Sequence, residues 1–561
     1  MEYLIILFLT SLSCFLTILN GLAFKKLLKF ENLEEDISEA GLYGILLISF
    51  LTFIINFFYK ISSTLSLIIL FLPILFILKE TFHQKKKILL YSILFGSISS
   101  IIMFTDNTNR PDAGLYHLPY TNIINHSKII LGVANLEFRF GHSSILQYFS
   151  AAFNNIIFSD KGILIPLANI FSITVIYFVN LIRKNNYQLK IIFFIFLFNI
   201  LYSMNRYSGF GNDDPAHMFF YLCFVNYILI FFNNENDNKK NVLFFALFAF
   251  LIKPFLIFVF LFPLILLFYK KIKFISGVNI FCSLLILLWF IKNILISSCI
   301  LYPEPKTCFK SLEWSTYYSS VSNPERVKRT SEAWSKNWNN YVSNNKTNFK
   351  QSDYIKEFNW IETWRNDHFK VFLKEIFPQI LLIIFFIFIK PRSEEIGILN
   401  RKISFQILLI GLFSSTLWFL KFPIYRYGQA YVILFINSFL LISLSSHYGF
   451  LKLKTKVIKH VIMGLIILLS LGVIIKNLIR INENYYIKYI DYPWPKMNSF
   501  TKNNSKNTNF PIKSKNGDLM YYKPTPYSLC MNSKSPCTSN VDVGEIKKKN
   551  KYGYIIYYYE N

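Results

Sequence analysis

The sequence lacks the short motifs by which several large enzyme classes are recognised. It has no P-loop, no GxGxxG segment after a strand, no GxSxG and no HExxH. Each of these motifs places one defined group, such as a nucleotide phosphate, a serine nucleophile or a zinc ion. ATP-driven transport and zinc-dependent proteolysis therefore have no support, and no internal repeat of fixed period is present.

Acidic residues are also scarce, with 32 Asp and Glu against 59 Lys and Arg, so the formal net charge is +27. In a soluble protein such an excess would suggest a nucleic-acid partner. Here 53% of the residues are hydrophobic and 60 are phenylalanine, and the basic residues gather in short runs between apolar segments. This is the positive-inside pattern of a polytopic membrane protein, and it predicts no nucleic-acid partner.

Apolar runs of roughly 16 to 24 residues recur along the chain, as membrane-spanning helices require. The first run is read as a helix rather than a signal peptide, because Glu2 stands where a basic residue is usual and no cleavage site follows. Lys253-Pro254 breaks another run into two short helices or one kinked pair. We expect an all-α integral membrane protein with about fourteen spans. These are residues 3–24, 39–59, 63–78, 88–104, 161–182, 189–205, 214–232, 241–253, 255–270, 274–297, 375–390, 404–421, 429–447 and 457–478.

The basic runs between these helices predict the orientation. With fourteen spans they all fall on one side, which the positive-inside rule makes cytoplasmic. Both termini then lie outside, with two periplasmic loops at 105–160 and 298–374. We expect a transmembrane domain (1–480) and a small periplasmic cap (481–561) whose last residues, KYGYIIYYYEN, read as a strand. The expected location is the inner membrane of a bacterium.

Four of the seven cysteines lie outside the expected helices, as the close pairs Cys299 with Cys308 and Cys530 with Cys537. Both pairs fall on the side predicted to be oxidising, which favours two disulfides. Free thiols are the alternative. A zinc site is disfavoured because no histidine stands at ligand spacing from either pair.

A polar island at residues 105–144 interrupts the apolar pattern. Asp112 lies just beyond an expected helix, where a carboxylate can act as a general base or hold a divalent metal (Mg or Mn) on a diphosphate leaving group. Asp106 could share this role. His117 could be a metal ligand or hydrogen-bond partner, and Tyr116 is included among the substrate-binding candidates. Capping acids in a solvated loop are the alternative reading.

The second half of this island carries Asn135 and Arg139, which we also expect to bind substrate. Arg139 could pair with a phosphate or with Asp112, or it could extend toward lipid headgroups. The apolar positions of residues 121–134 fit a short interfacial helix that would fold the loop over the site.

Four further charged residues are candidates for substrate or phosphate contact. Asp213 and Asp214 precede Pro215, which is also the ordinary start of a helix. Lys253 lies in an apolar stretch, where a lysine should face a cavity, a carboxylate or a phosphate. Arg426 stands between two tyrosines in a short outer loop and could contact a diphosphate.

Five tryptophans are concentrated in the long loop at 298–374. Aromatic rings outside the bilayer can stack on sugar rings or seat amphipathic helices at the interface, although plain packing is the default. The helical pattern of residues 331–342 and 353–376 predicts two such helices. The tryptophans are Trp314, Trp334, Trp338, Trp360 and Trp364.

At this level the chain resembles the GT-C type glycosyltransferases, in which an outer loop after a membrane helix carries the acidic motif. The matching position is Asp112, with Asp106 as a second. The stretches DAGLYHLP, ANLEFRFGHSS and WFIKNILISSCILYP also resemble an uncharacterised bacterial membrane family placed near that superfamily. Two departures stand out: three extra spans precede the loop, and the paired acid of the family is missing beside Asp112.

The resemblance implies an enzyme that transfers sugar from a polyprenyl-phosphate donor to a glycan or lipid acceptor at the outer membrane surface. The product would be a cell-envelope glycan such as lipopolysaccharide. One alternative is an O-antigen polymerase or ligase, which relies on outer arginines more than on an acid. The other is a transporter or flippase without chemistry, which predicts discontinuous helices in both halves.

Overall fold

The structure is a computed structural model of the whole chain. It describes all residues except 1, 32–35, 106–111, 204–210, 233–235, 344–348, 392–400, 445–450, 454, 485–509, 514–517, 525–528, 533, 539–545 and 561. Asp106 therefore lies outside the described residues.

Within the described ranges, nine helices are long and apolar enough to cross a membrane. The chain is thus a multi-pass helical membrane protein, as the apolar runs predicted. The nine are α1 (Glu2–Leu27), α2 (Ile37–Asn56), α4 (Leu78–Thr105), α7 (Ile165–Lys184), α9 (Asp213–Phe232), α12 (Gly277–Ser297), α16 (Trp360–Phe388), α17 (Arg401–Lys421) and α18 (Tyr425–Leu444).

The other expected spans coincide with shorter helices or with helices whose apolar part is shorter. These are α3 (Ser63–Phe71) with η1 (Leu72–Ile77), α8 (Tyr187–Tyr202), α10 (Asn236–Ile252), η6 (Pro254–Phe260) with α11 (Leu261–Phe268), and α19 (Thr455–Asn484). All fourteen apolar runs therefore overlap helical segments.

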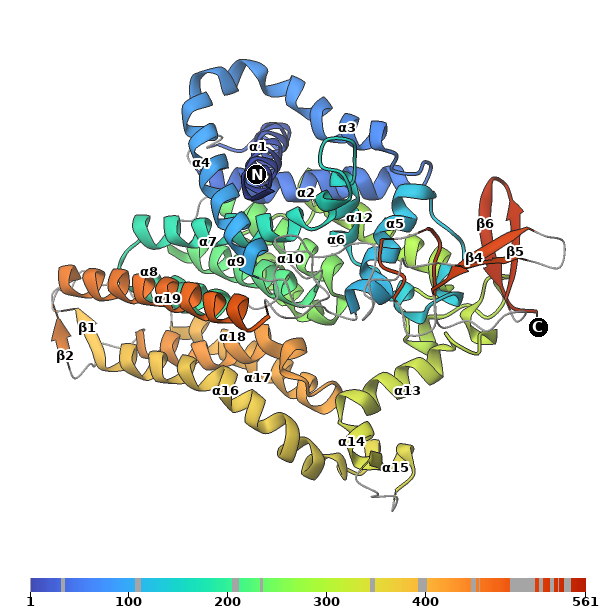
Figure 1. The fold of residues 1–561 in the computed structure, drawn as a ribbon. Helices are drawn as coiled ribbons and strands as arrows, with labels where there is room; N and C mark the ends of the chain where they lie inside the picture. Colours follow the sequence, from blue (N-terminus) through green and yellow to red (C-terminus); the bar gives the residue numbers. More distant parts are fainter. Residues whose placement is uncertain are drawn as a thin grey trace.

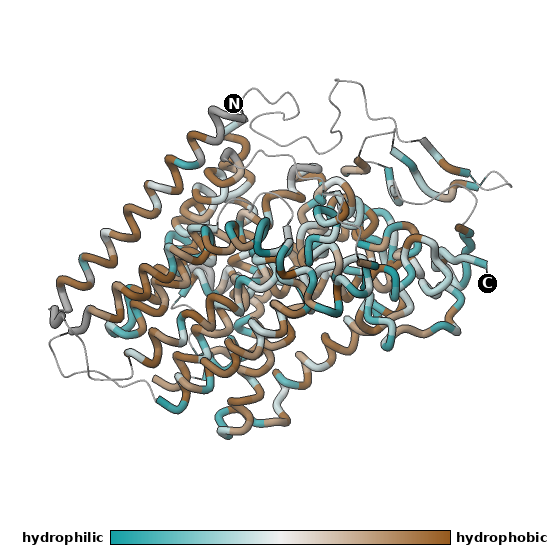
Figure 2. Tube along the Cα trace, turned by 90° about the horizontal axis from the view of Figure 1, so that it is seen from below, coloured by the Kyte–Doolittle hydropathy of each residue, from teal (hydrophilic) through white to brown (hydrophobic). Residues whose placement is uncertain are grey.

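The axes of helices α7 to α10 and α16 to α19 lie broadly along one common line, with successive helices running up or down it (Figure 1). One end of this bundle is here called the cap end. It holds α5 (Leu118–His126), the loop helices α13 (Pro324–Ser335), α14 (Trp338–Ser343) and α15 (Gln351–Lys356), and the strands β4 (Leu519–Lys523), β5 (Lys547–Lys551) and β6 (Tyr554–Tyr558). At the other end lies the parallel pair β1 (Ile389–Pro391) and β2 (Leu451–Leu453). Hydrophobic residues follow the long helices, and hydrophilic ones gather toward the cap end (Figure 2).

Small residues let the first two helices approach closely. A Cβ added to Gly21 would lie 1.6 Å from the carbonyl oxygen of Ala40, and one added to Gly44 would lie 1.8 Å from that of Thr17. In lipid, helices associate through such packing and through hydrogen bonds, because the surrounding tails are as apolar as the side chains. Glycine at both positions thus brings α1 and α2 into backbone contact.

The break at Lys253-Pro254 separates two helices. Helix α10 ends at Ile252, Lys253 has an extended backbone (φ −146°, ψ 100°), and Pro254 begins η6. Proline cannot donate a backbone hydrogen bond and disfavours helical angles at the residue before it. The side chain of Lys253 therefore leaves the chain from a gap between helices.

The loop after α4 holds η2 (Ala113–His117), α5, η3 (Val133–Asn135), η4 (Phe138–His142) and α6 (Ile145–Phe153). The prediction of an interfacial helix over 121–134 is wrong after His126, because Ser127 is extended (φ −140°, ψ 148°). Residue Leu131 then pairs in parallel with Ile556 of strand β6. The N–H and C=O groups of Leu131 are hydrogen-bonded to strand β6 and not within a helix. Buried backbone groups need such partners.

The long loop after α12 folds into η7 (Pro305–Thr307), η8 (Thr316–Tyr318), α13 (Pro324–Ser335), α14 (Trp338–Ser343) and α15 (Gln351–Lys356) before α16 begins. Asn337 (φ 66°) and Phe358 (φ 59°) interrupt the two helices that the sequence predicted here. One disulfide, Cys299–Cys308, closes the start of the loop.

Two antiparallel hairpins form the described part of the cap. They are β3 (Phe510–Lys513) with β4 (Leu519–Lys523), and β5 (Lys547–Lys551) with β6 (Tyr554–Tyr558). A second disulfide joins Cys530 to Cys537. The strand expected in the last residues is β6.

Candidate functional site

Three charged residues that the sequence singled out separately meet at one point of the cap end. Asp213 is the first residue of α9, Lys253 lies in the gap after α10, and Arg426 is the second residue of α18. The Lys253 ammonium donates a hydrogen bond to Asp213 Oδ1, and Arg426 Nε lies 3.7 Å from Asp213 Oδ2. One carboxylate is thus shared by two cations. We call these three residues the Asp213 cluster.

The cluster is built from chain ends and breaks. Pro215 in the first turn of α9 and Pro254 after Lys253 both mark helix starts, where polar side chains need not compete with helix packing. His217, one turn after Asp213, contacts the carbonyl oxygen of Arg426 through Nε2 at 2.8 Å. This contact fixes the start of α18 on α9. His217 was not among the residues predicted from the sequence, although its i+4 spacing from Asp213 places both on one helix face.

Aromatic rings form one wall of the cluster. Lys253 Nζ lies 3.9 Å from the ring centre of Tyr427, and Arg426 Nη2 donates to the Tyr427 hydroxyl at 3.5 Å. The guanidinium carbon of Arg426 also lies 5.6 Å from the ring of Trp334. Cations over aromatic faces are stabilised by the ring quadrupole. The side chains of Lys253 and Arg426 remain 15% and 34% exposed, so an anion can reach both.

The turn that carries Asp112 faces the same region. Burial raises the pKa of the Tyr116 phenol, and the negative charges of Asp112 and Asp213 raise it further. Tyr116 is therefore within electrostatic reach of both carboxylates. The charge of Asp112 also acts on Arg426 and Tyr427. The structure thus brings the acid of the polar island and the Asp213 cluster into one neighbourhood.

His117 is a buried neutral residue beside this turn. Its ring lies 4.0 Å from that of Tyr116, centre to centre, and burial lowers its pKa to about 3. Among the described residues its Nδ1 has no hydrogen-bond partner. A buried polar atom of this kind is costly unless something satisfies it.

Arg139 and Asn135 are placed differently from the other candidates. Arg139 pairs with Glu137 at 3.0 Å rather than with Asp112, and its guanidinium lies 5.9 Å from the Tyr116 ring. Asn135 is fully buried and donates to the carbonyl oxygens of Trp314 (3.2 Å) and Tyr557 (3.1 Å). Asn135 thus joins the polar island to the long loop and to the cap.

The described part of the chain brings no three His, Cys, Asp or Glu side chains together as a metal site requires. Asp213 is already held by two cations, and Asp214, next in α9, acts electrostatically on Lys253. Mg²⁺ and Mn²⁺ prefer several oxygen ligands without competing ammonium groups. These donors do not fit the divalent ion considered above, and their chemistry suits an anion.

An apolar cleft of about 360 Å³ lies between α8, α16 and α19. Its walls include Phe198, Leu382 and Leu469, and its polar members are Tyr202 and Lys476, whose Nζ lies 5.7 Å from the Tyr202 ring centre. Tyr202 is in turn within electrostatic reach of Tyr425, the neighbour of Arg426. One end of the cleft therefore approaches the cations.

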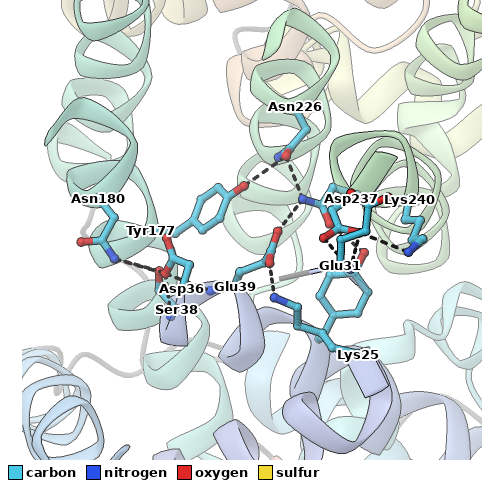
Figure 3. Close-up of polar contacts among 12 residues, drawn as sticks. Lys25, Glu31, Asp36, Ser38, Glu39, Tyr177, Asn180, Asn226, Asp237 and Lys240 are labelled. Atoms are coloured by element: carbon cyan, nitrogen blue, oxygen red, sulfur yellow. Dashed lines mark hydrogen bonds and ion pairs between the residues drawn. The ribbon is translucent and has the colours of Figure 1, made fainter. Parts of the chain in front are cut away.

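A second polar network joins helices α1, α2, α7, α9 and α10 (Figure 3). Fully buried Lys25 pairs with Glu39, which accepts from Asn241 at 2.7 Å. Asn241 donates onward to Asn226 at 2.9 Å, and Tyr177 donates to the same Asn226 oxygen at 3.1 Å. This network was not predicted from the sequence, because its members stand singly in apolar helices. Its polar groups hydrogen-bond to one another and thereby hold the helices together.

The fold and the cluster define a multi-pass helical membrane protein with a charged, partly exposed site at one end of its bundle. The chain belongs to the family described as Domain of unknown function (DUF8201), whose model matches residues 3–433. The matched range includes Asp112 and the whole Asp213 cluster. No curated protein and no solved structure matches the chain.

Proposed function

We propose that this protein is a GT-C-like glycosyltransferase that takes a sugar from a polyprenyl-phosphate donor and adds it to a cell-envelope glycan or lipid. The observation that carries the proposal is the convergence of Lys253 and Arg426 on Asp213, with Arg426 also within electrostatic reach of Asp112. Two cations beside a carboxylate fit a reaction in which a phosphate leaves and a hydroxyl attacks.

The cations would hold the phosphate of the donor. Negative charge develops on the leaving phosphate in the transition state, and preorganised cations stabilise it most where water is partly excluded. Arg426 presents a planar fork that matches phosphate oxygens, whereas Lys253 acts as a point charge. Asp213 keeps both cations oriented before the donor arrives and yields part of its contact when the phosphate binds.

Asp112 would accept the proton of the acceptor hydroxyl. A carboxylate can serve as general base when it lies within hydrogen-bond reach of the attacking group. Asp112 is partly exposed and sits on a short turn next to the cluster, whereas Asp213 is already committed to two cations. The two acids thereby take different roles.

The apolar cleft between α8, α16 and α19 would hold the lipid chain of the donor. Its lining is almost entirely hydrocarbon, and Leu468 on its rim is 65% exposed, as expected for a side chain that faces lipid. Lys476 and Tyr202 are the polar side chains among those that line this cleft. A lipid-linked substrate would then enter sideways from the bilayer.

The proposal includes a topology of fourteen crossings in a bacterial inner membrane, with both termini and the cap end outside. It is supported by the basic loops, which all fall on one side under this count. A cysteine placed in the exposed part of the cap should then react with a membrane-impermeant maleimide in intact spheroplasts. A reaction only after lysis would reverse the orientation.

The test of function is envelope-glycan profiling of cells that carry Asp112→Asn or Arg426→Gln, at matched protein levels in the membrane. Asp353→Asn and Lys306→Met remove the same charges elsewhere in the long loop and serve as matched controls. A lost or truncated glycan in the first pair only would support the proposal. An unchanged glycan in all four would refute it.

An O-antigen polymerase or ligase is the second candidate, and one observation favours it. The acid nearest the cations, Asp213, is already ion-paired, so the cluster is dominated by basic groups that contact phosphate. In that case Arg426→Gln abolishes the glycan while Asp112→Asn leaves it intact.

A transporter is the third candidate. The helix break at Lys253 is the kind of discontinuity a transporter would use, and transport would leave the glycan chemistry unchanged in cell lysates.

A further inference from the structure

One of the five tryptophans in the long loop differs from the rest. Trp314 and Trp364 donate to carbonyl oxygens, of Ile294 at 2.9 Å and of Pro423 at 2.6 Å. Trp360 is fully buried, and Trp338 stacks on Tyr341 with ring centres 5.4 Å apart. These four are accounted for by packing.

Trp334 is 44% exposed and lies against Arg426, one of the two cations of the proposed site. Its ring is 5.6 Å from the guanidinium carbon of Arg426, and its centre is 6.5 Å from that of Tyr427, at an interplanar angle of 48°. An exposed tryptophan loses the free energy of burial. Its ring is therefore open to a partner that would cover it.

The helix α13 holds this ring firmly in place. Asn323 caps the helix by accepting from the N–H groups of Glu325 and Arg326. Glu332 pairs with Lys336 at 2.7 Å and lies 3.9 Å from Lys421, the last residue of α17. Helix α13 is thus capped at its start and meets the end of α17 through Glu332 and Lys421.

The spacing matches the build of a glycosyl phosphate. The sugar is joined directly to the phosphate, so a phosphate held by Arg426 places the sugar within one ring length of that residue. A pyranose has an apolar C–H face that packs on aromatic rings and hydroxyls at its edge that accept or donate hydrogen bonds. The ring of Trp334 can pack on the apolar face, and Arg426 and Tyr427 can hydrogen-bond to the hydroxyls.

We infer that Trp334 and Tyr427 form a binding platform for the sugar ring of the donor, beside the cations that hold its phosphate. The inference rests on the proposed function, and it adds the residue that recognises the sugar rather than the phosphate or the lipid. Trp334 would then set which donor is preferred, while Lys253 and Arg426 would bind any polyprenyl phosphate.

The test is direct binding of two probes to purified protein in detergent: undecaprenyl phosphate, and a panel of the same lipid joined to single hexoses. Wild type should bind one of the sugar-linked lipids more tightly than the bare phosphate. Trp334→Ala should weaken that lipid roughly threefold to tenfold and leave the bare phosphate unchanged. Trp334→Phe should restore part of the difference.

The matched control is Tyr318→Ala, which removes an aromatic ring of 43% exposure from the same loop. It should change neither affinity. If Trp334→Ala keeps the full preference of wild type, the platform is refuted, while an effect of Arg426→Gln on both probes still upholds the phosphate site. If wild type binds neither class of probe, the proposed function fails and the platform fails with it.

Discussion

The carbonyl oxygen of Gly114 accepts a hydrogen bond of 3.0 Å from the backbone N–H of Met531. Gly114 stands two residues after Asp112, and Met531 directly follows the disulfide residue Cys530. The cap thereby touches the turn that carries the proposed general base. The contact is close, because a Cβ on Gly114 would lie 2.3 Å from Met531 Sδ and 2.8 Å from Leu529 Cβ.

Replacing this glycine should loosen the cap. Gly114→Ala would force the turn and the cap apart, at a cost of about 1 to 3 kcal/mol of unfolding free energy. Hydrogen exchange of residues 113–126 should then become faster, and the envelope glycan should decrease. Gly464→Ala is the matched control, since nothing lies within 4 Å of its added Cβ. Equal exchange in both variants would contradict the contact.

The disulfide Cys530–Cys537 should stabilise the same contact. Closing a loop with a sequence separation of 7 restricts the unfolded chain and contributes about 2 to 3 kcal/mol. The double variant Cys530→Ser, Cys537→Ser should expose the cap to limited proteolysis while the membrane helices stay intact. The pair Cys299→Ser, Cys308→Ser should affect the long loop and leave the cap resistant. Cap cleavage that is the same in both double variants would argue against this role.

Asp213→Asn should make the cations available to added anions. Loss of the shared carboxylate leaves Lys253 and Arg426 facing each other and should destabilise the protein by about 1 to 3 kcal/mol, a value reduced by their partial exposure. Inorganic pyrophosphate should then raise the melting temperature of the variant more than that of wild type. Sodium chloride of equal ionic strength is the control, and Arg426→Gln should abolish the gain. Equal stabilisation of wild type and Asp213→Asn would show that pyrophosphate binds elsewhere.

The stability of the protein should fall with falling pH because of His117. In the folded state its pKa is about 3, since burial outweighs the opposing effect of the Asp213 charge, and Arg426 also disfavours its protonation. In the unfolded chain a histidine takes up its proton near pH 6.5. Between these values the unfolded state binds the extra proton, so stability is full above about pH 6.5 and declines toward pH 3.

At pH 5 the protonation of His117 in the unfolded chain should lower the free energy of unfolding by roughly 2 kcal/mol. Thermal unfolding of wild type and His117→Gln in detergent from pH 7.5 to 4.5 measures the effect. The variant should show a shallower decline. Parallel curves would mean that His117 keeps its ordinary pKa in the folded protein.

The fold was largely predictable because the bilayer leaves few choices. A long apolar run must satisfy its own backbone in lipid, so each of the fourteen runs overlaps a helical segment. The sequence wrongly predicted a helix over 127–134 because the backbone partners of this segment are distant: Leu131 pairs with strand β6, and Ile129 and Gly132 bond to Asn56 and Leu295. No local periodicity records such pairings. The number of full crossings is equally hard to read, because α10 and α11 are short segments joined at Lys253.

The site was predictable in its parts and not in its assembly. Asp213, Lys253 and Arg426 each stood out as charges beside apolar runs, which are costly unless used. That they share one contact depends on how α9, α10 and α18 pack, which the sequence does not state. Asn135 shows the opposite case: a polar residue in a promising motif proved to be a buried joint. Trp334 could not be told from its four packed neighbours without its exposure.

The joint at Asn135 also orders the assembly of the molecule in time. Its side chain bonds the carbonyl oxygen of Tyr557, a partner 422 residues away. The polar island and strand β6 can thus meet only after more than four hundred intervening residues have been made. Contacts of such long range form late and slowly. The joint between the island, the long loop and the cap is therefore expected to close after the helices that lie between them in the chain have formed.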